Sequence, residues 1–216
     1  VLAGLGYAVA RRLEFELDLL CLEDDLWERL EYKRRKNIKK GARMGVVLHD
    51  PSAAEGVPHL RRLQAESAQR IVQRGGRDIT YRGRHLRDPA EVLVESGLGR
   101  IVVAEVAGEI VSAGLFTCFN GLVYHTLSGH SRKALETQAP TFLLWETIKR
   151  YKREGARRFN FGGCSAEAVN EGSPEHGIYI YKMGFGGTCL ECASGSKVLR
   201  KAAHRTMGLL RSLLRQ

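Results

Sequence analysis

Apolar and charged residues alternate near the start of the chain. In Arg12–Cys21 the apolar positions 13, 15, 17 and 19 alternate with Arg12, Glu14, Glu16 and Asp18. A period of two is typical of a strand that buries one face. A further short strand is expected over Val46–His49.

Two hairpins are predicted in the middle of the chain. Arg100–Val106 and Glu109–Phe116 are rich in β-branched residues and are joined by Ala107-Gly108, a tight-turn signature. Asn120-Gly121 predicts a second turn, which leads into a strand over Leu122–Leu127. Three antiparallel strands are therefore expected in succession.

Helical spacing of apolar residues predicts the helices. The first begins in the acidic stretch Leu22–Leu30, where carboxylates suit the positive end of the helix dipole, and continues through Lys33–Lys40. Asp50-Pro51-Ser52 supplies a turn and a cap for a long second helix. The expected helices cover residues 22–40, 52–74, 89–97, 139–154 and 197–216.

The stretch from residue 124 to residue 187 predicts a crossover unit. The strand Leu122–Leu127 is followed by a bend at Ser128–Ser131, a polar loop and the helix Ala139–Glu154. A second strand over Arg158–Phe161, a Gly-Gly turn, a long loop and a third strand ending near Lys182 complete the unit. Ligands usually bind at the carboxyl ends of such parallel strands. We therefore expect the site there, with the amino group of Lys182 and the start of the long helix facing one hollow.

Composition and charge narrow the class of partner. A chain of 216 residues, 44% of them hydrophobic, can bury one good core, and a net charge of +10 favours an anionic partner such as nucleic acid, nucleotide phosphate or anionic lipid. Six of the eight residues in Lys33–Lys40 are basic, which indicates either a solvated helix face or a phosphate-binding patch. Five cysteines without a regular framework favour a reducing compartment, so we expect a cytoplasmic protein.

The domain organisation is expected to have three parts. Residues 1–42 are interpreted as a linker strand and basic helix at the junction with an upstream unit, because the chain opens in an element already under way. Residues 43–195 form the main domain, and residues 196–216 form a basic amphipathic helix. That helix suits peripheral contact with an anionic membrane, tRNA binding or docking on the domain itself.

Four motifs carry a resemblance to a known family. The hairpin VVAEVAGEIVSAGLF is followed by YHTLSGHS, LLWETIKRYKREGARRFNFGG and GIYIYKMGFGG, and the upstream LWERLEYKRRKNIKKGARMGVVL precedes them. In this order they resemble the C-terminal half of the Fem-type peptidoglycan-bridge aminoacyltransferases and their GNAT-like N-acyltransferase relatives. The resemblance implies an α/β fold, a GNAT-like mixed and mostly antiparallel sheet flanked by helices. It also implies transfer of an acyl or aminoacyl group to an amine of a peptide, cell-wall precursor or amino-sugar.

The resemblance also implies site residues. Lys182 corresponds to a lysine associated with binding the phosphate-bearing substrate or its transition state, and the basic cluster corresponds to a motif suited to nucleotide or tRNA phosphates. Beside these basic groups, the substrate-binding set takes in the neighbours of Lys182, giving Arg34, Arg35, Lys39, Tyr181, Phe185 and Gly186. The segment before the long helix lacks the glycines of the usual CoA cradle, so its donor-binding candidates are side chains: Arg132, Lys133, Gln138 and Thr141. This favours aminoacyl-tRNA over acyl-CoA as the anionic co-substrate, with no tightly bound cofactor and no metal.

A general base is not fixed by the pattern. Attack of an amine on an ester or thioester needs positioning, oxyanion stabilisation and loss of a proton. The candidates for accepting that proton lie near the site loops: His125, His130, Glu167, Glu171, Glu175 and His176. Of these, His176 lies on a polar loop and is the freest to react, whereas His125 suits a packed ring equally well. Asn160 alternates with phenylalanines on its strand and is expected to face the cleft.

Three hypotheses remain at this point. The first is a Fem-like or GNAT-like acyltransferase that depends on Lys182. The second is an RNA-binding module on a catalytically inactive GNAT-like scaffold. The third is a membrane-surface protein that acts through residues 197–216. Four ordered motifs favour the first, whereas charge alone supports the others.

Overall fold

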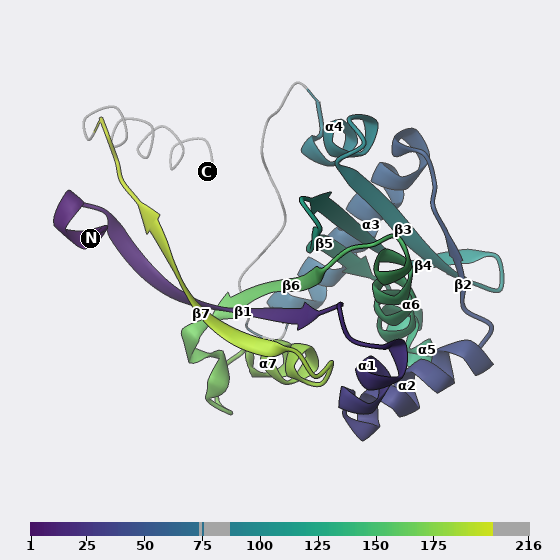
Figure 1. Cartoon of the computed structure of the whole chain (residues 1–216). Coiled ribbons are helices and arrows are strands. Elements are labelled where there is room, and N and C mark those ends of the chain that lie inside the picture. Colours follow the sequence, from purple (N-terminus) through teal and green to yellow (C-terminus); the bar gives the residue numbers. More distant parts are fainter. Residues whose placement is uncertain (74, 76–86, 201–216) are drawn as a thin grey trace.

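The computed structural model describes residues 1–73, 75 and 87–200, and a single mixed sheet runs through this part of the chain. Its order is β2-β3-β4-β5-β6-β1-β7, and every neighbouring pair is antiparallel except β5 and β6, which are parallel (Figure 1). The strands are β1 (Ala8–Asp18), β2 (Val47–His49), β3 (Gly99–Val106), β4 (Glu109–Phe119), β5 (Leu122–His130), β6 (Arg158–Ser165) and β7 (Thr188–Ser196). The predicted mixed, mostly antiparallel sheet is confirmed.

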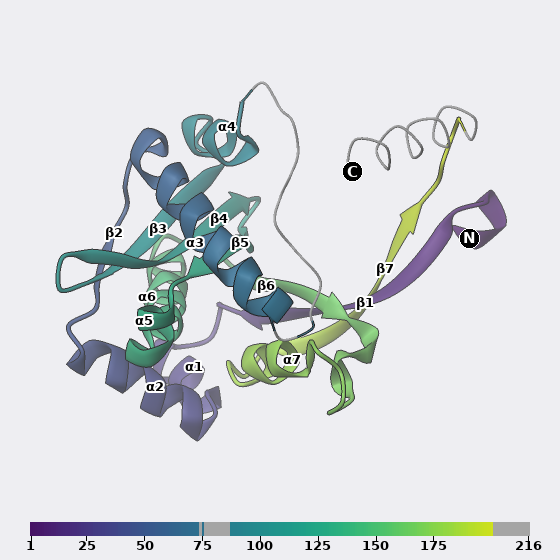
Figure 2. The same cartoon turned by 180° about the vertical axis from the view of Figure 1, so that it is seen from behind.

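Helices cover both faces of the sheet. They are α1 (Glu23–Arg29), α2 (Tyr32–Arg43), α3 (Ala53–Gln73), α4 (Pro89–Glu95), α5 (Arg132–Thr137), α6 (Ala139–Arg153) and α7 (His176–Met183). Helix α6 lies on one face with α1 and α2 beside it, and α3 crosses the opposite face (Figures 1 and 2). Alternate residues of β3 face the two layers: Ile101 packs with the α3 side and Val102 with the α6 side. The helix and hairpin predictions for this core are confirmed.

The turns of the two hairpins explain their sequences. Ala107 and Gly108 have φ values of 52° and 79°, and Asn120 and Gly121 have φ values of 48° and 76°. Two consecutive residues with positive φ make the turn that matches the twist of paired strands, which is why glycine and asparagine stand there.

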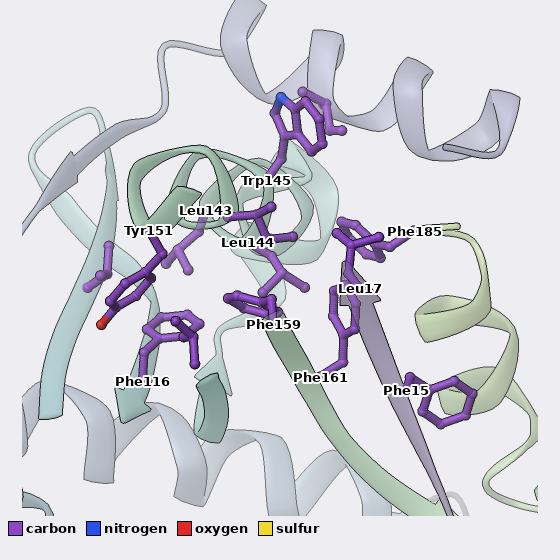
Figure 3. Close-up of a cluster of buried hydrophobic side chains, with 14 of the residues drawn as sticks. Phe15, Leu17, Phe116, Leu143, Leu144, Trp145, Tyr151, Phe159, Phe161 and Phe185 are labelled. Atoms are coloured by element: carbon purple, nitrogen blue, oxygen red, sulfur yellow. The ribbon is translucent and has the colours of Figure 1, made fainter. Parts of the chain in front are cut away.

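Aromatic side chains dominate the larger core. Phe116, Phe159, Phe161 and Phe185 form a chain of rings beneath α6, with centroid separations of 6.0 Å, 5.1 Å and 5.1 Å along the series (Figure 3). Each is at most 2% exposed. Burying a side chain of this size contributes about 1.5–3 kcal/mol. This core therefore fixes β6 and the segment after α7 against α6.

The segment ending at Lys182 is a helix, so its prediction as a strand is wrong. Its β-branched and aromatic residues, Ile178 to Tyr181, favour a strand, but α7 includes them all. The place beside β1 in the sheet is taken instead by β7, which pairs with β1 from Ala8 to Glu16. Tertiary pairing of the following segment thus decides the structure, and Lys182 lies in the last turn of α7.

Two further boundaries differ from the prediction. The expected continuous helix over residues 22–40 breaks at Leu30, whose backbone is extended, because Leu30 is buried and the Glu31 amide donates to the Gly184 carbonyl at 2.9 Å. The expected bend and polar loop after Leu127 instead extend β5 to His130 and form α5, which Ser131 caps by accepting from the Ala134 amide.

The N-terminal strand lies inside the sheet. From Arg12 to Asp18, β1 pairs with β6 on one side, whereas Ala8–Arg11 pair with β7 alone, so the two strands extend from the body as a ribbon (Figure 1). The boundary expected at residue 42 stays a prediction. The helix expected over residues 197–216 lies largely outside the described residues. In the described part, no helix combines the length and apolar character that crossing a membrane requires.

Candidate functional site

The two parallel strands separate soon after they begin. Residue pairs are formed at Leu122, Val123 and Tyr124 of β5 with Arg158, Phe159 and Asn160 of β6, whereas β5 continues to His130 and β6 to Ser165. Beyond these pairs, β6 leaves β5 and follows β1 (Figure 1). Backbone groups of both strands are therefore released from the ladder at this point.

The predicted Gly-Gly turn after Phe161 is instead a bend within β6, which continues through Gly162 and Gly163 to Ser165. The register of β6 against β1 shifts here, and Gly162 has a φ of 72°, a conformation that favours glycine. A Cβ on Gly162 would lie 3.3 Å from the His125 carbonyl oxygen and 3.7 Å from Lys182 Nζ. The bend thus brings the start of the strand separation and the Lys182 amino group together.

Lys182 is held over this bend. Its Nζ donates to the Gly163 carbonyl at 3.0 Å and lies 5.6 Å from the centre of the Phe15 ring. Burial lowers the pKa of Lys182 to about 8; nearby Cys164 and Glu14 raise it, and Arg12 lowers it. The ammonium is therefore the main form at neutral pH, with reduced hydration. A partly desolvated cation of this kind stabilises negative charge on a ligand more strongly than a surface lysine does.

A hydrogen-bonded group supports the bend from β1. Tyr124 Oη donates to Glu14 Oε1 at 2.9 Å, and Asn160 Nδ2 donates to Glu14 Oε2 at 2.9 Å. The Asn160 Oδ1 atom in turn accepts from the Gly162 amide at 2.7 Å. Burial and the bond to Glu14 raise the pKa of Tyr124 to about 12, so Tyr124 is a neutral donor. Asn160 therefore positions the bend, and its buried side chain is hydrogen-bonded through both its nitrogen and its oxygen.

Sequence reasoning missed Glu14 and Tyr124. Glu14 is one of several carboxylates in an alternating strand, and only the pairing of β1 with β6 opposite Gly163 gives it this role. The one available signal was the position of Tyr124 and Asn160 near the starts of the two predicted parallel strands.

Four of the six candidate bases have packed or bonded side chains, whereas Glu167 and Glu171 are exposed. His125 stacks on Phe116 at 4.8 Å, and burial, followed by the charge of Lys182, lowers its pKa to about 3. Burial lowers the pKa of His130 to about 4, and its Nδ1 lies 2.8 Å from Ser112 Oγ. His176 begins α7, with Nδ1 3.0 Å from the Ala168 carbonyl oxygen. Glu175 accepts from the Ser165 amide at 2.6 Å. His125 and His130 are therefore neutral at pH 7.

The predicted substrate-binding residues fall into two groups. Arg34 is 5% exposed, and its guanidinium lies 4.5 Å from the centre of the Tyr181 ring, so this pair joins α2 to α7. Phe185 is fully buried, and Gly186 lies so close to the Arg29 backbone that a Cβ would approach its carbonyl oxygen to 2.4 Å. These residues pack the segment beside Lys182 instead of facing a ligand.

The second group lies on the outer side of α2. Arg35 and Lys39 line a separate concave surface along α1 and α2, whose lining does not include Lys182. Helix α2 therefore has one face that packs towards α7 and another that carries exposed cations.

The predicted donor-binding residues do not converge. Arg132 is exposed and lies 3.5 Å from Glu136, whereas Lys133 donates to Glu109 at 2.8 Å and so binds the β3–β4 hairpin. Gln138 has a φ of 62° and separates α5 from α6, and its side chain donates to the Leu135 carbonyl at 2.7 Å. Thr141 is buried and its side chain forms a hydrogen bond with Tyr181. Burial raises the pKa of Tyr181, and this hydrogen bond opposes the rise.

The Tyr181–Thr141 contact connects the start of α6 with α7. Lys182, the next residue, instead faces β6. The expected hollow shared by the Lys182 amino group and the start of α6 therefore stays a prediction.

Comparison with known proteins shows which family the chain belongs to. The sequence family described as an acetyltransferase (GNAT) domain matches residues 28–183. The chain belongs to this family. As a GNAT domain it is an N-acyltransferase domain, and the family match covers Lys182, Asn160 and Tyr124 but not Glu14.

Solved structures agree on the fold. FemX superposes with a TM-score of 0.67 at 12% identity, over 82% of this chain and 59% of that chain. The C-terminal domain of a putative lysylphosphatidylglycerol synthetase from Agrobacterium fabrum gives 0.60 at 15% identity, over 98% of this chain and 67% of that one. L-PGS from Bacillus licheniformis gives 0.59 at 16%, over 99% and 69%. No curated protein matches the sequence. This GNAT domain thus shares the fold of these proteins and spans 59% of the FemX chain.

Proposed function

We propose that this GNAT domain transfers an aminoacyl group from an aminoacyl-tRNA to a primary amine of a peptide, cell-wall precursor or amino-sugar. The observation that carries the proposal is the position of the Lys182 ammonium, partly desolvated and held by the Gly163 carbonyl where β5 and β6 separate. Lys182 would act there on the negative charge that develops at the carbonyl of the donor.

The reaction follows from the chemistry of the two substrates. The amine nitrogen forms a bond to the carbonyl carbon of the ester, and the carbonyl oxygen gains negative charge. The bond to the ester oxygen then breaks, this oxygen takes up a proton, and the amine nitrogen loses one. Lys182 stabilises the charged oxygen, and removing one such donor typically lowers kcat by about 10²–10³. No covalent intermediate with the protein is required.

Two observations favour an ester of tRNA over acyl-CoA. Residues 131–141 contain no glycine, and the first turn of α5 is closed by the Ser131 cap. The glycine-rich loop that usually presents backbone amides to a pyrophosphate is therefore missing from this segment. The names of two structural neighbours, FemX and lysylphosphatidylglycerol synthetase, support the same direction.

An RNA-binding module without catalysis is the second candidate, favoured by the net charge of +10 and the exposed cations of α2. The two candidates differ in their dependence on Lys182. A binding module keeps its RNA affinity after Lys182→Ala and has no transfer activity to lose.

The test is a transfer assay with two donors. The full chain is incubated separately with charged tRNA and with acyl-CoA, and transfer of the labelled acyl group to candidate amines is followed. We expect transfer from charged tRNA, its loss in Lys182→Ala, and normal transfer in Lys40→Ala, which removes an exposed lysine outside the site. Transfer from acyl-CoA alone would overturn the donor assignment, and full activity of Lys182→Ala would overturn the site.

A further inference from the structure

A basic groove runs along α1 and α2 on the outside of the molecule. It has a volume of about 730 Å³ and is lined by Trp27, Tyr32, Arg35, Lys36, Lys39, Ala42 and Arg43. Four cations and two aromatic rings thus share one hollow.

The groove is a consequence of the register of α2. Tyr32, Lys36, Lys39 and Arg43 stand at positions i, i+4, i+7 and i+11, so they form one stripe along the helix. The opposite face, with Arg34, Ile38 and Gly41, is buried. A Cβ at Gly41 would lie 2.6 Å from Phe142, which shows how closely this face packs on α6. The inner face is therefore committed to the core and the outer stripe is presented to solvent.

The four cations of the groove are not neutralised by the described part of the chain. Within residues 1–73, 75 and 87–200, none of Arg35, Lys36, Lys39 and Arg43 forms an ion pair. Cations on α6 behave differently: Lys149 pairs with Glu146, Arg150 with Asp50 and Arg153 with Glu23. Concentrated positive charge without local partners attracts a polyanion.

The aromatic rings of the groove make it suitable for stacking of bases as well as for binding charged groups. Tyr32 is 76% exposed although it is a large ring with an apolar face. Trp27 forms the inner wall, lies 5.4 Å from Trp145 in the core, and has Lys39 Nζ 5.8 Å from its centre. Exposed rings between cations are the combination that binds single-stranded nucleic acid, because bases stack on the rings while the cations contact the backbone.

We propose that the groove along α1 and α2 binds a single-stranded segment of RNA. A 12-residue helix is about 18 Å long, which suits a few nucleotides. The concave shape favours a strand over a flat lipid surface. The proposal rests on the proposed function in one respect, that the RNA is part of the aminoacyl donor. Arg34, on the inner face of the same helix, packs on Tyr181 beside Lys182, so α2 connects the groove with the transfer site.

The test measures RNA affinity and does not depend on transfer. Fluorescence anisotropy of a labelled single-stranded RNA of about 12 nucleotides is recorded with the full chain at several salt concentrations. We expect Lys36→Ala and Arg43→Ala to weaken binding and to lower the salt dependence by about one ion per substitution. We expect Tyr32→Ala to weaken binding about fivefold or more and Tyr32→Phe to retain it.

Lys33→Ala and Lys40→Ala are the matched controls. Both remove one exposed lysine from the same helix, outside the groove lining, and are expected to leave affinity within about twofold. Equal weakening by the controls, or absence of RNA binding by the wild type, would overturn the proposal. So would groove substitutions that leave RNA affinity unchanged but abolish binding to vesicles containing phosphatidylglycerol.

The failures of the two proposals are distinguishable. Groove-dependent RNA binding without transfer from any donor contradicts the proposed function and supports the groove. Transfer from charged tRNA with no effect of the groove substitutions on RNA affinity supports the proposed function and overturns the groove.

Discussion

Lys182 carries its charge in a partly desolvated place, which gives its contribution a characteristic pH dependence. Burial lowers its pKa to about 8, so the ammonium loses its proton as the pH rises through about 8. We expect kcat/KM to fall above that pH in the wild type, since the charged form stabilises the developing oxyanion. We expect Lys182→Arg to remove this alkaline limb, with lower activity throughout because the guanidinium differs in shape. A flat profile up to pH 10 in the wild type would contradict this role.

Glu14 sets part of that pKa. Its charge raises the pKa of Lys182, so Glu14→Gln is expected to move the alkaline limb of the rate profile to lower pH. The same substitution leaves one of the two donors, Tyr124 or Asn160, without its acceptor, at a cost of about 1–3 kcal/mol. Glu16→Gln is the control, because this carboxylate contacts Arg158. If the alkaline limb of the rate profile does not move in Glu14→Gln, Glu14 does not act on the pKa of Lys182.

The lowered pKa of Lys182 should also make the free energy of unfolding depend on pH. Below pH 8 Lys182 is charged in both the folded and the unfolded chain. Between about 8 and 10.5 the folded protein releases the proton and the unfolded chain keeps it, so the free energy of unfolding rises with pH. Relative to Lys182→Met, the wild type should gain about 2–3 kcal/mol over this range, in urea unfolding at pH 7.5 and 10.5. A constant difference between the two proteins would contradict the lowered pKa.

At the residue scale, the sequence predicted the lysine but not its surroundings. Lys182 and Asn160 stand in motifs that can be recognised one at a time. The function of Glu14 depends on a strand more than 140 residues away in the chain, and alternation alone does not show which of several carboxylates will face the bend.

Close packing between α3 and β5 depends on one glycine. A Cβ at Gly129 would lie 2.4 Å from the Gln64 amide nitrogen and 2.5 Å from the Leu63 carbonyl carbon, and both are backbone atoms. Gly129→Ala must therefore separate α3 from the sheet, and we expect a loss of about 2–4 kcal/mol in the free energy of unfolding, measured with urea. Gly172→Ala is the control, since its Cβ would meet no atom within 4 Å. Equal effects of both substitutions would contradict the packing described.

At the element scale, periodicity predicted the long helices and the hairpins because their signals are local. It failed where a neighbouring segment decides the structure. The residues of α7 favour a strand on their own, and only the pairing of β1 with β7 leaves them helical. The break between α1 and α2 likewise depends on Gly184, which accepts the amide of Glu31 from far along the chain.

The distribution of charge belongs to the whole molecule. The net charge of +10 attracts polyanions in general, and this part of the attraction is screened by salt. We expect RNA affinity of the full chain to fall steeply between 50 and 200 mM salt, about tenfold or more. The same titration on Tyr32→Ala should give a parallel line at lower affinity, because stacking releases no counterions. A change of slope in Tyr32→Ala would show that its effect is not stacking.

We propose that Lys182, placed where β5 and β6 separate, enables this GNAT domain to transfer aminoacyl groups. The most direct measurement is single-turnover transfer of a labelled aminoacyl group from charged tRNA to an amine acceptor, by the wild type, Lys182→Ala and Lys40→Ala. We predict transfer by the wild type and Lys40→Ala, and a rate lower by about 10²–10³ in Lys182→Ala with its fold intact by circular dichroism. An unimpaired rate in Lys182→Ala would contradict the claim.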